Sequence, residues 1–541
     1  MTSRTVALLA GGLAAIYVSV RLALLWRFPP HVDEVTFASY VLRGLDNPEA
    51  RFIALTAGQQ PLLPWAGIGI ATLGVEPLTS LRLVSFLAGA GTAVAAGWLG
   101  YRLGGRQTAL ASAGFWVLLP LGVVYSVMGL YDPLAAFLIV SALVLQVMLA
   151  ERPRLDVALL LGVALGLGLL TKLTSIASIA LLPASLMLFD WGPTGRARRL
   201  GRWLGAVLVA LVVAWLLYRL MYLSQFSDDV DEGRAALAYH SLADFLAEPR
   251  RWLEANWPSY QAALIGYLTV PGVACVLTGV AKGLRSPGVR ALTGLLLLWG
   301  VVPIAGAVAL ADVPFVRWIV IAGPPLVVLG GLGLVTVTCF VVRLASRDQP
   351  RLVAPVGIGV VALLLLPAII WEAHTVAQPA VRPYPGHDDI DYVREWSAGG
   401  PWLDLVPEIE RRVGSGRALV ATAGPGVGYL ALALRDNPRV GFVDAETSND
   451  PGALYGLENG RPLPSGPDDL AWRLVRGYDR PRRGIPVTLW QRGVLVDLVF
   501  AATPDELRAV IGGSDNDFDA FVEARPAVAA WLNAWYEAQD E

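Results

Sequence analysis

Charged residues and cysteines are scarce in this chain of 541 residues. Only 16% of the residues are charged, whereas 55% are hydrophobic, and the mean hydropathy is +0.55. Soluble globular domains have about 25% charged residues, so this composition excludes an ordinary soluble protein and predicts a polytopic membrane protein. The two cysteines, Cys275 and Cys339, lie inside apolar runs, which argues against a structural disulfide outside the membrane.

Cleavable-signal features and internal repeats are also lacking. Val6–Trp26 is long enough to span the hydrocarbon layer, and Arg27-Phe28-Pro29-Pro30 is a poor cleavage site, so we expect this segment to be retained as the first span. No internal repeat or low-complexity tract is evident in the sequence.

Long apolar runs dominate the chain as far as Trp371. After the first span they cover Leu81–Leu103, Thr108–Leu149, Leu155–Phe189, Trp203–Leu223, Tyr260–Val280, Ala291–Val342 and Leu352–Trp371. A helix rises about 1.5 Å per residue and the hydrocarbon core is about 30 Å thick, so the three longest runs must fold back as helical hairpins. The sequence therefore predicts an α-helical membrane domain with about 11 transmembrane helices.

Basic residues between the runs predict the orientation, because cytoplasmic loops retain positive charge. Alternate loops carry them: Arg102 and Arg106; Arg152 and Arg154; Arg196, Arg198, Arg199 and Arg202; Lys282, Arg285 and Arg290; Arg343, Arg347 and Arg351. With these loops and the N-terminus in the cytoplasm, the outer side receives the Asp33 loop, the acidic stretch 228–232 and everything after Trp371.

Two domains follow from this division. Residues 1–371 form the predicted transmembrane catalytic domain, in which the first outer loop, about residues 27–80, contains juxtamembrane helices. Residues 372–541 are more polar and form a predicted extracytoplasmic α/β domain, with strands at 418–422 and 440–443 and a helix at 427–434.

Acidic and basic residues gather at the predicted outer ends of the helices. Asp33-Glu34 follows the helix-breaking Pro29-Pro30, and the three hairpins have tips at 125–133, at Lys172 and at 311–317. Membrane-level charges are costly unless paired, hydrated or functional. Each tip also has a simple structural explanation: Lys172 can reach the interface, Asp132 can cap a helix, and Arg317 can hold a lipid headgroup.

Carboxylates beside Lys and Arg at the lipid boundary suit one reaction in particular. A carboxylate takes the proton of a hydroxyl acceptor, while basic side chains stabilise a lipid phosphate as the leaving group. ATP and nucleotide sugars are absent outside the cytoplasm, so we expect a lipid-borne donor.

Several segments in order resemble the membrane-embedded GT-C glycosyltransferases that use polyprenyl-phosphate sugars, especially the aminoarabinose transferase and protein O-mannosyltransferase families. The matching segments are Asp33-Glu34, Phe37–Arg43, Gln59–Trp65, Leu81–Ser85, Tyr131–Leu134 and Gly166–Lys172. The resemblance is strongest from the N-terminus to the end of the apolar run at Phe189. Gln59-Gln60 stands where aminoarabinose transferases have Glu-Lys, which argues against the lipid A modification and leaves the donor sugar open.

The resemblance implies a GT-C fold and an inverting transfer, by single displacement, from a polyprenyl-phosphate-linked hexose or pentose to a glycan, lipid or protein hydroxyl. It implies Asp33 as the catalytic base, Glu34 as the residue that either supports it or binds the acceptor, and Asp132 as the residue that completes the acidic site. Arg82 and Lys172 are then candidate phosphate contacts, as is Arg317 from its position. Candidate substrate-binding residues are His31, Gln60 and Tyr131.

The sequence leaves open two other classes of function and the use of a divalent metal ion. We expect a reaction without a metal, although adjacent acids can also hold Mg²⁺ or Mn²⁺. A polytopic secondary transporter would also have about 11 helices, but such folds usually show repeats and mid-membrane polar sites. A non-catalytic scaffold of the cell envelope is the other alternative. The expected partners are the lipid-linked donor, the acceptor and membrane lipids, and no nucleic acid.

Overall fold

The computed structural model describes residues 2–189, 191, 195–227, 241–345, 350–394, 397–399, 402–414, 418–423, 432–434, 437–444, 455–459, 472–478 and 487–492. The chain divides into two compact units. Unit 1 consists of Met1–Phe28 and Tyr40–Asp388, and unit 2 consists of Pro29–Ser39 and Asp389–Glu541. The short segment Pro29–Ser39 therefore groups with the C-terminal part of the chain, and that part begins at Asp389, beyond the predicted domain boundary at 371/372.

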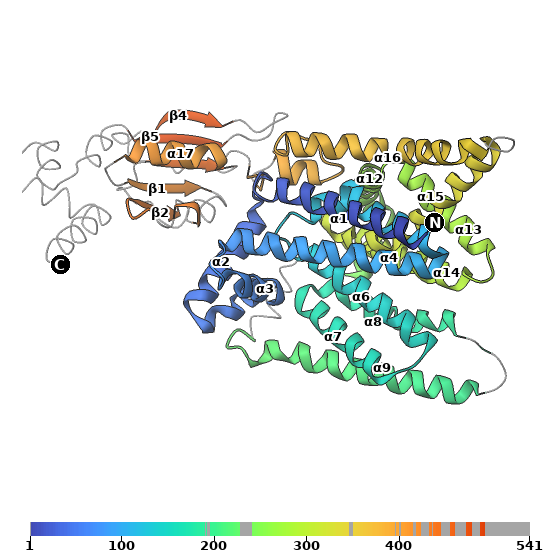
Figure 1. Cartoon of the computed structure of the whole chain (residues 1–541). Coiled ribbons are helices and arrows are strands. Elements are labelled where there is room, and N and C mark those ends of the chain that lie inside the picture. Colours follow the sequence, from blue (N-terminus) through green and yellow to red (C-terminus); the bar gives the residue numbers. More distant parts are fainter. Residues whose placement is uncertain are drawn as a thin grey trace, which may run out of the picture. The chain divides into compact units, whose positions relative to one another are not determined.

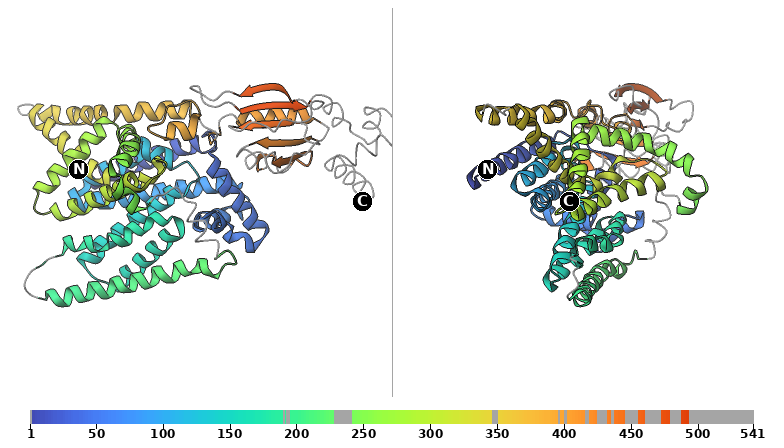
Figure 2. Two further views of the ribbon diagram at one scale, coloured as in Figure 1. Left: turned by 180° about the vertical axis from the view of Figure 1, so that it is seen from behind. Right: turned by 90° about the vertical axis from the view of Figure 1, so that its right-hand side faces the viewer.

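Helices, including short 3-10 turns labelled η, make up unit 1, and the first residues of α2, Val32–Ser39, belong to unit 2. Up to residue 188 the elements are α1 (Ser3–Leu25), α2 (Val32–Asp46), η1 (Pro48–Ala57), α3 (Leu62–Ala71), α4 (Pro77–Leu118), α5 (Pro120–Tyr125), α6 (Tyr131–Glu151), α7 (Leu155–Thr171), η2 (Leu173–Ser175), α8 (Ile176–Ala180) and η3 (Leu182–Leu188). They are followed by α9 (Arg196–Tyr218), η4 (Arg219–Leu223), α11 (Leu242–Ala247), α12 (Pro249–Leu268), α13 (Val270–Arg285), α14 (Arg290–Leu310), η5 (Val316–Ala322), α15 (Gly323–Ala345), η6 (Pro350–Leu352) and α16 (Val353–Ala377). Figure 1 shows α4, α6, α7, α9 and α16 running roughly parallel or antiparallel to one another, and Figure 2 shows the same helices from two further sides.

The hydropathy of these helices makes the protein a multi-pass membrane protein. Seven helices in the described part of the chain are long and apolar enough to cross a membrane, or eight if α12 and α13 count as one span. The predicted total of about 11 spans is not confirmed. The predicted span Tyr260–Val280 is bent by 93° between α12 and α13, at Thr269 with φ 63°. The predicted hairpin Leu155–Phe189 pairs the 17-residue α7 with the short pieces α8 and η3.

Glycines permit a break in α4 and close contacts between helices in unit 1. Helix α4 is interrupted at Gly104-Gly105, where Gly105 has φ 77°. This break lies between the predicted apolar runs Leu81–Leu103 and Thr108–Leu149, as their separation in the sequence predicted. At the crossing of α13 and α15, a Cβ on Gly333 would lie 1.8 Å from the Cys275 carbonyl oxygen. Small residues let helix backbones approach in this way. All residues of the Gly323–Leu334 half of α15 are buried.

Unit 2 contains a mixed five-stranded sheet in the order β2-β1-β3-β5-β4. The strands are β1 (Ala418–Ala423), β2 (Val440–Asp444), β3 (Tyr455–Asn459), β4 (Trp472–Tyr478) and β5 (Val487–Arg492). β1 pairs in parallel with β2 and β3, while β5 pairs antiparallel with β3 and β4. Both predicted strands are confirmed as β1 and β2. The predicted helix 427–434 lies mostly, and the acidic stretch 228–232 wholly, outside the described residues.

Two further helical segments belong to unit 2, namely the π-helical turn η7 (Ile390–Arg394) and helix α17 (Trp402–Val413). Leu405, Ile409 and Val413 are all buried. Their spacing of four residues places them on one face of α17, as expected for a helix that packs against the core of an α/β unit.

Candidate active site

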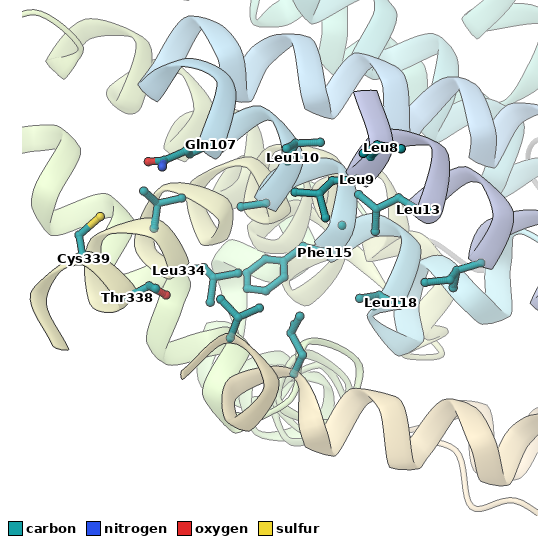
Figure 3. A pocket seen from close by; sticks show the side chains of 17 residues that line it. Leu8, Leu9, Leu13, Gln107, Leu110, Phe115, Leu118, Leu334, Thr338 and Cys339 are labelled. Atoms are coloured by element: carbon teal, nitrogen blue, oxygen red, sulfur yellow. The ribbon is translucent and has the colours of Figure 1, made fainter. Parts of the chain in front are cut away.

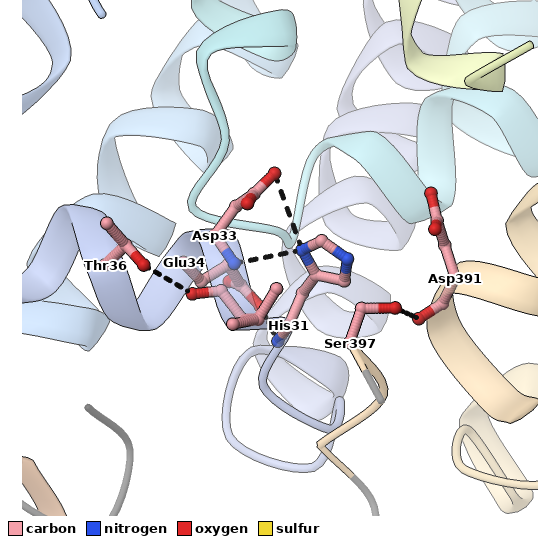
Figure 4. Close-up of polar contacts among 7 residues, drawn as sticks. His31, Asp33, Glu34, Thr36, Asp391 and Ser397 are labelled. Carbon is pink, nitrogen blue, oxygen red and sulfur yellow. Dashed lines mark hydrogen bonds and ion pairs between the residues drawn. The ribbon is translucent and has the colours of Figure 1, made fainter. Parts of the chain in front are cut away.

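The acidic pair begins helix α2 and is held there by a reciprocal hydrogen-bond pattern, shown in Figure 4. Pro29 and Pro30 end the preceding segment, and the His31 carbonyl accepts the first helical hydrogen bond, from Val35 N, at 3.2 Å. His31 is therefore the N-cap residue. Its Nδ1 accepts a hydrogen bond from Asp33 N (3.2 Å), while its own backbone N–H donates to Glu34 Oε2 (2.9 Å). This is a variant of the capping box, with histidine in the cap position and its side chain accepting from the second helical residue instead of the third.

The capping box gives the two acids different environments. Glu34 is fully buried, and its carboxylate accepts the N-cap hydrogen bond. The Asp33 side chain is 32% exposed, and its Oδ2 lies 3.9 Å from His31 Nδ1. Asp33 is thus the acid that a substrate in solvent can reach, whereas Glu34 supports the turn.

The hydrogen bond at His31 also fixes its tautomer. Because Asp33 N–H donates to Nδ1, that nitrogen carries no proton, and a neutral His31 is protonated on Nε2. His31 itself is buried, with 4% of its surface exposed. Its observed contacts therefore organise the acidic turn, and its predicted role in substrate binding stays a prediction.

In unit 1, Asp132 and Lys172 form an ion pair between the start of α6 and the end of α7. Lys172 Nζ donates to Asp132 Oδ1 at 2.5 Å. Asp132 lies in the first turn of α6, and Lys172 ends α7 in an extended conformation (φ −156°, ψ 135°). The side chains are 4% and 19% exposed, respectively. These two predicted residues, 40 positions apart in sequence, are thus brought together, with the ammonium as the more accessible group.

Arg82 has a structural contact at the end of α1. Its Nη1 donates to the carbonyl oxygens of Leu25 (2.7 Å) and Phe28 (3.0 Å), and the side chain is buried. Leu25 is the last residue of α1, and the last carbonyls of a helix lack partners within the helix, so this bond caps α1, while the bond to Phe28 holds the segment that follows it. A contact between Arg82 and a lipid phosphate stays a prediction.

The remaining predicted residues lie in three other parts of unit 1. Arg317, in η5, places its guanidinium 4.5 Å from the centre of the Phe315 ring. Tyr131 opens α6 and is 4% exposed. Gln60 precedes α3 and is also 4% exposed, and its Oε1 accepts no hydrogen bond from the described residues. A buried amide oxygen of this kind is costly unless a water or ligand satisfies it.

Two polar contacts in unit 1 were not predicted. Asp388 is fully buried, and its Oδ2 accepts hydrogen bonds from the hydroxyls of Tyr125 (2.7 Å) and Tyr267. Arg21 of α1 lies 3.5 Å from Glu372 of α16, and both are buried. Tyr125 lies at a predicted hairpin tip, but nothing in the sequence pairs it with the distant Asp388.

The groove in Figure 3 is apolar and lies elsewhere in unit 1. Its volume is about 470 Å³, and its lining includes Leu8, Leu13, Phe115, Leu334 and Leu365 from α1, α4, α15 and α16. None of the predicted site residues lines it. Such a lining suits hydrocarbon and offers no acid or base for sugar transfer.

The described residues include no cluster of three or more His, Cys, Asp or Glu side chains arranged to hold a metal ion. The acidic turn combines His31 with Asp33 at 3.9 Å, and Glu34 is committed to the capping box. The expectation of a metal-free reaction stays a prediction.

The fold is that of the membrane-embedded GT-C glycosyltransferases, as the resemblance in sequence predicted. Residues 58–218 match the sequence model of the dolichyl-phosphate-mannose-protein mannosyltransferase family. No curated protein sequence matches the chain.

Solved structures with this fold include ArnT from Cupriavidus metallidurans. Its apo form is 16% identical, with a TM-score of 0.52, and the alignment covers 89% of this chain and 98% of ArnT. The form bound to undecaprenyl phosphate gives a TM-score of 0.53 at 16% identity, covering 91% and 98%. The archaeal oligosaccharyltransferase AglB from Archaeoglobus fulgidus, in complex with an inhibitory peptide and a dolichol-phosphate, is 12% identical with a TM-score of 0.51, covering 82% and 69%.

Proposed function

We propose that the protein is an inverting glycosyltransferase that moves a hexosyl or pentosyl group from a polyprenyl-phosphate donor to a hydroxyl group of a glycan, lipid or protein. One observation carries this proposal: a solvent-accessible carboxylate, Asp33, is fixed in the first turn of a helix while its neighbour Glu34 is sequestered. Support also comes from similar folds, since the ArnT structure holds undecaprenyl phosphate and the AglB structure holds a dolichol-phosphate.

In the proposed reaction Asp33 is the general base. It accepts the proton of the acceptor hydroxyl while that oxygen attacks the anomeric carbon. The bond between this carbon and the phosphate oxygen breaks, and the polyprenyl phosphate leaves with the bonding electrons. Attack opposite the leaving group inverts the anomeric configuration.

The resemblance in sequence makes two basic residues candidates for stabilising the charge that develops on the phosphate. Lys172 is the strongest candidate, because Asp132 orients its ammonium group and part of the side chain is exposed. Arg317 is the second candidate. We further propose that the N-terminus is cytoplasmic and that the C-terminal domain, residues 372–541, is extracytoplasmic, where a lipid-linked donor replaces nucleotide sugars.

The two acids provide a direct test. The full-length protein in nanodiscs would be supplied with a panel of polyprenyl-phosphate sugars and hydroxyl acceptors, and products would be detected by mass spectrometry. Asp33→Asn removes the base and should lower transfer by about 100-fold or more. Glu34→Gln keeps an oxygen that can accept the His31 N–H, so its transfer should fall by less than about tenfold.

A matched control is Glu254→Gln, because Glu254 is an exposed acid on α12, paired with Arg250. Its transfer rate should equal that of the unchanged protein. Full transfer by Asp33→Asn would exclude Asp33 as the base. Solute flux into sealed vesicles without sugar transfer would instead favour the transporter alternative.

A further inference from the structure

The acidic turn packs against the segment that opens the C-terminal part of unit 2. We name the described residues Asp391–Val393 and Ser397–Gly399 the clamp segment. Val32 N donates a hydrogen bond to Ser397 O (3.1 Å), and His31 forms an isolated antiparallel bridge with Ala398. Residues 31–32 and 397–398 are far apart in the sequence, so the contact is tertiary.

Tyr392 of the clamp segment makes a side-chain contact with the turn. Its ring meets the His31 imidazole edge-on, with ring centroids 5.2 Å apart and an interplanar angle of 86°. Tyr392 is 6% exposed and His31 4%, so both rings are held in a packed interior. This contact restricts the imidazole that accepts the Asp33 N–H.

Two other features show that the clamp segment is closely fitted. A Cβ on Gly399 would lie 1.8 Å from the Pro30 carbonyl oxygen, which leaves no room for a side chain. Ser397 Oγ donates to Asp391 O (2.8 Å), closing the clamp segment on itself beside His31, as Figure 4 shows.

We propose that Tyr392 is a positioning residue that acts through His31 to hold Asp33 in its reactive conformation. The inference rests on the proposed role of Asp33 as the general base, and it assigns part of the C-terminal domain to the reaction. The chain of contacts is short: Tyr392 packs on the imidazole, the imidazole Nδ1 accepts Asp33 N–H, and this bond sets the first turn from which the Asp33 carboxylate projects.

Loss of this support should affect the chemical step more than substrate binding. A displacement of about 1 Å at a reacting group can cost about 100-fold in rate. Donor binding depends on other groups, so the donor KM should change little. A loss of kcat at constant KM is therefore the expected signature, whereas general destabilisation of unit 2 would lower the amount of active protein.

The kinetic test compares substitutions at three positions in the full-length protein. Tyr392→Leu should lower kcat by about tenfold to 100-fold at unchanged donor KM, and Tyr392→Phe, which keeps the ring, should recover most of the loss. His31→Leu should behave like Tyr392→Leu. His31→Asn should be less affected, because an asparagine oxygen can occupy the place of Nδ1 as acceptor. Leu405→Ala, at a buried position of α17, is the control for destabilisation of unit 2.

A spectroscopic test is independent of sugar transfer. In protein labelled with ¹⁵N-histidine, the four histidine signals can be assigned by single substitutions. His31 should show an unprotonated Nδ1 and a protonated Nε2, and Tyr392→Leu should abolish this single tautomer. Leu405→Ala should retain it.

The two tests separate the inference from the proposed function. If no donor supports transfer but Tyr392→Leu disturbs the His31 tautomer, the proposed function fails, whereas the positioning of His31 by Tyr392 stands. If the protein transfers sugar but Tyr392→Leu changes neither kcat nor the tautomer, the inference is overturned and the proposed function stands. A protonated Nδ1 in the unchanged protein would also overturn it.

Discussion

Replacing Lys172 by methionine removes the positive partner of an almost fully buried carboxylate. The Nζ and Oδ1 atoms are 2.5 Å apart, and the Asp132 side chain is only 4% exposed. At an effective dielectric constant of about 20, unit charges at this separation attract by about 7 kcal/mol. Desolvation of both groups offsets much of this attraction.

The two single substitutions and the double substitution should therefore not be additive. Lys172→Met leaves the carboxylate buried without its ammonium and should lower the free energy of unfolding by about 3–5 kcal/mol. Asp132→Asn should cost less, because Lys172 is 19% exposed and can reach water. The double variant should recover about 2 kcal/mol relative to the sum of the single losses.

Reversible denaturation in mixed micelles would measure the cycle, and donor kinetics would be recorded on the same samples. Lys172→Met should also raise the donor KM or lower kcat/KM, since the proposed phosphate contact is lost. Strict additivity of the two unfolding losses would refute the conclusion that the pair is an energetic unit, whatever the effect on transfer.

Three further predictions concern packing, capping and pH. Gly333→Leu should prevent α13 and α15 from approaching, because even a Cβ would meet Cys275 O; a thermal unfolding temperature equal to that of the unchanged protein would contradict this. Arg82→Met should lower the free energy of unfolding by about 1–3 kcal/mol, since the carbonyl oxygens of Leu25 and Phe28 lose their donor; an increase in donor KM without destabilisation would instead indicate a phosphate contact. Hydrogen bonds from Arg411 hold the pKa of Glu408 below its ordinary value of 4.5. The ionised group therefore stabilises unit 2 above pH 4.5, and this contribution is lost as the pH falls through the lowered pKa. Glu408→Gln should make stability depend less on pH in the acid range, as measured by thermal unfolding at a series of pH values.

Much of the fold follows from patterns that are local in sequence. Apolar runs predicted the helical membrane domain, and short apolar runs predicted β1 and β2, because burial in lipid or against a sheet selects side chains over stretches of about 5 to 25 residues. The number of spans did not follow, since the bend at Thr269 and the shortness of α8 and η3 depend on how the helices pack.

The candidate site divides in the same way. The sequence identified Asp33-Glu34 by the preceding prolines, but the distinction between an exposed Asp33 and a buried Glu34 required the geometry of the capping box. Lys172 and Asp132 were each predicted from a hairpin tip, and their ion pair shows that these two tips meet in unit 1.

By itself, then, the sequence determined the class of protein: a membrane-embedded helical domain followed by an α/β domain, with carboxylates and basic residues at the helix ends. Hydrophobicity and charge are properties of each residue, so they can be read without a fold. Only the tertiary structure decided the partners. The contacts of Tyr392 with His31, of Asp388 with two tyrosines and of Arg82 with the end of α1 join residues distant in the chain, and their distances are set by the packing of whole elements.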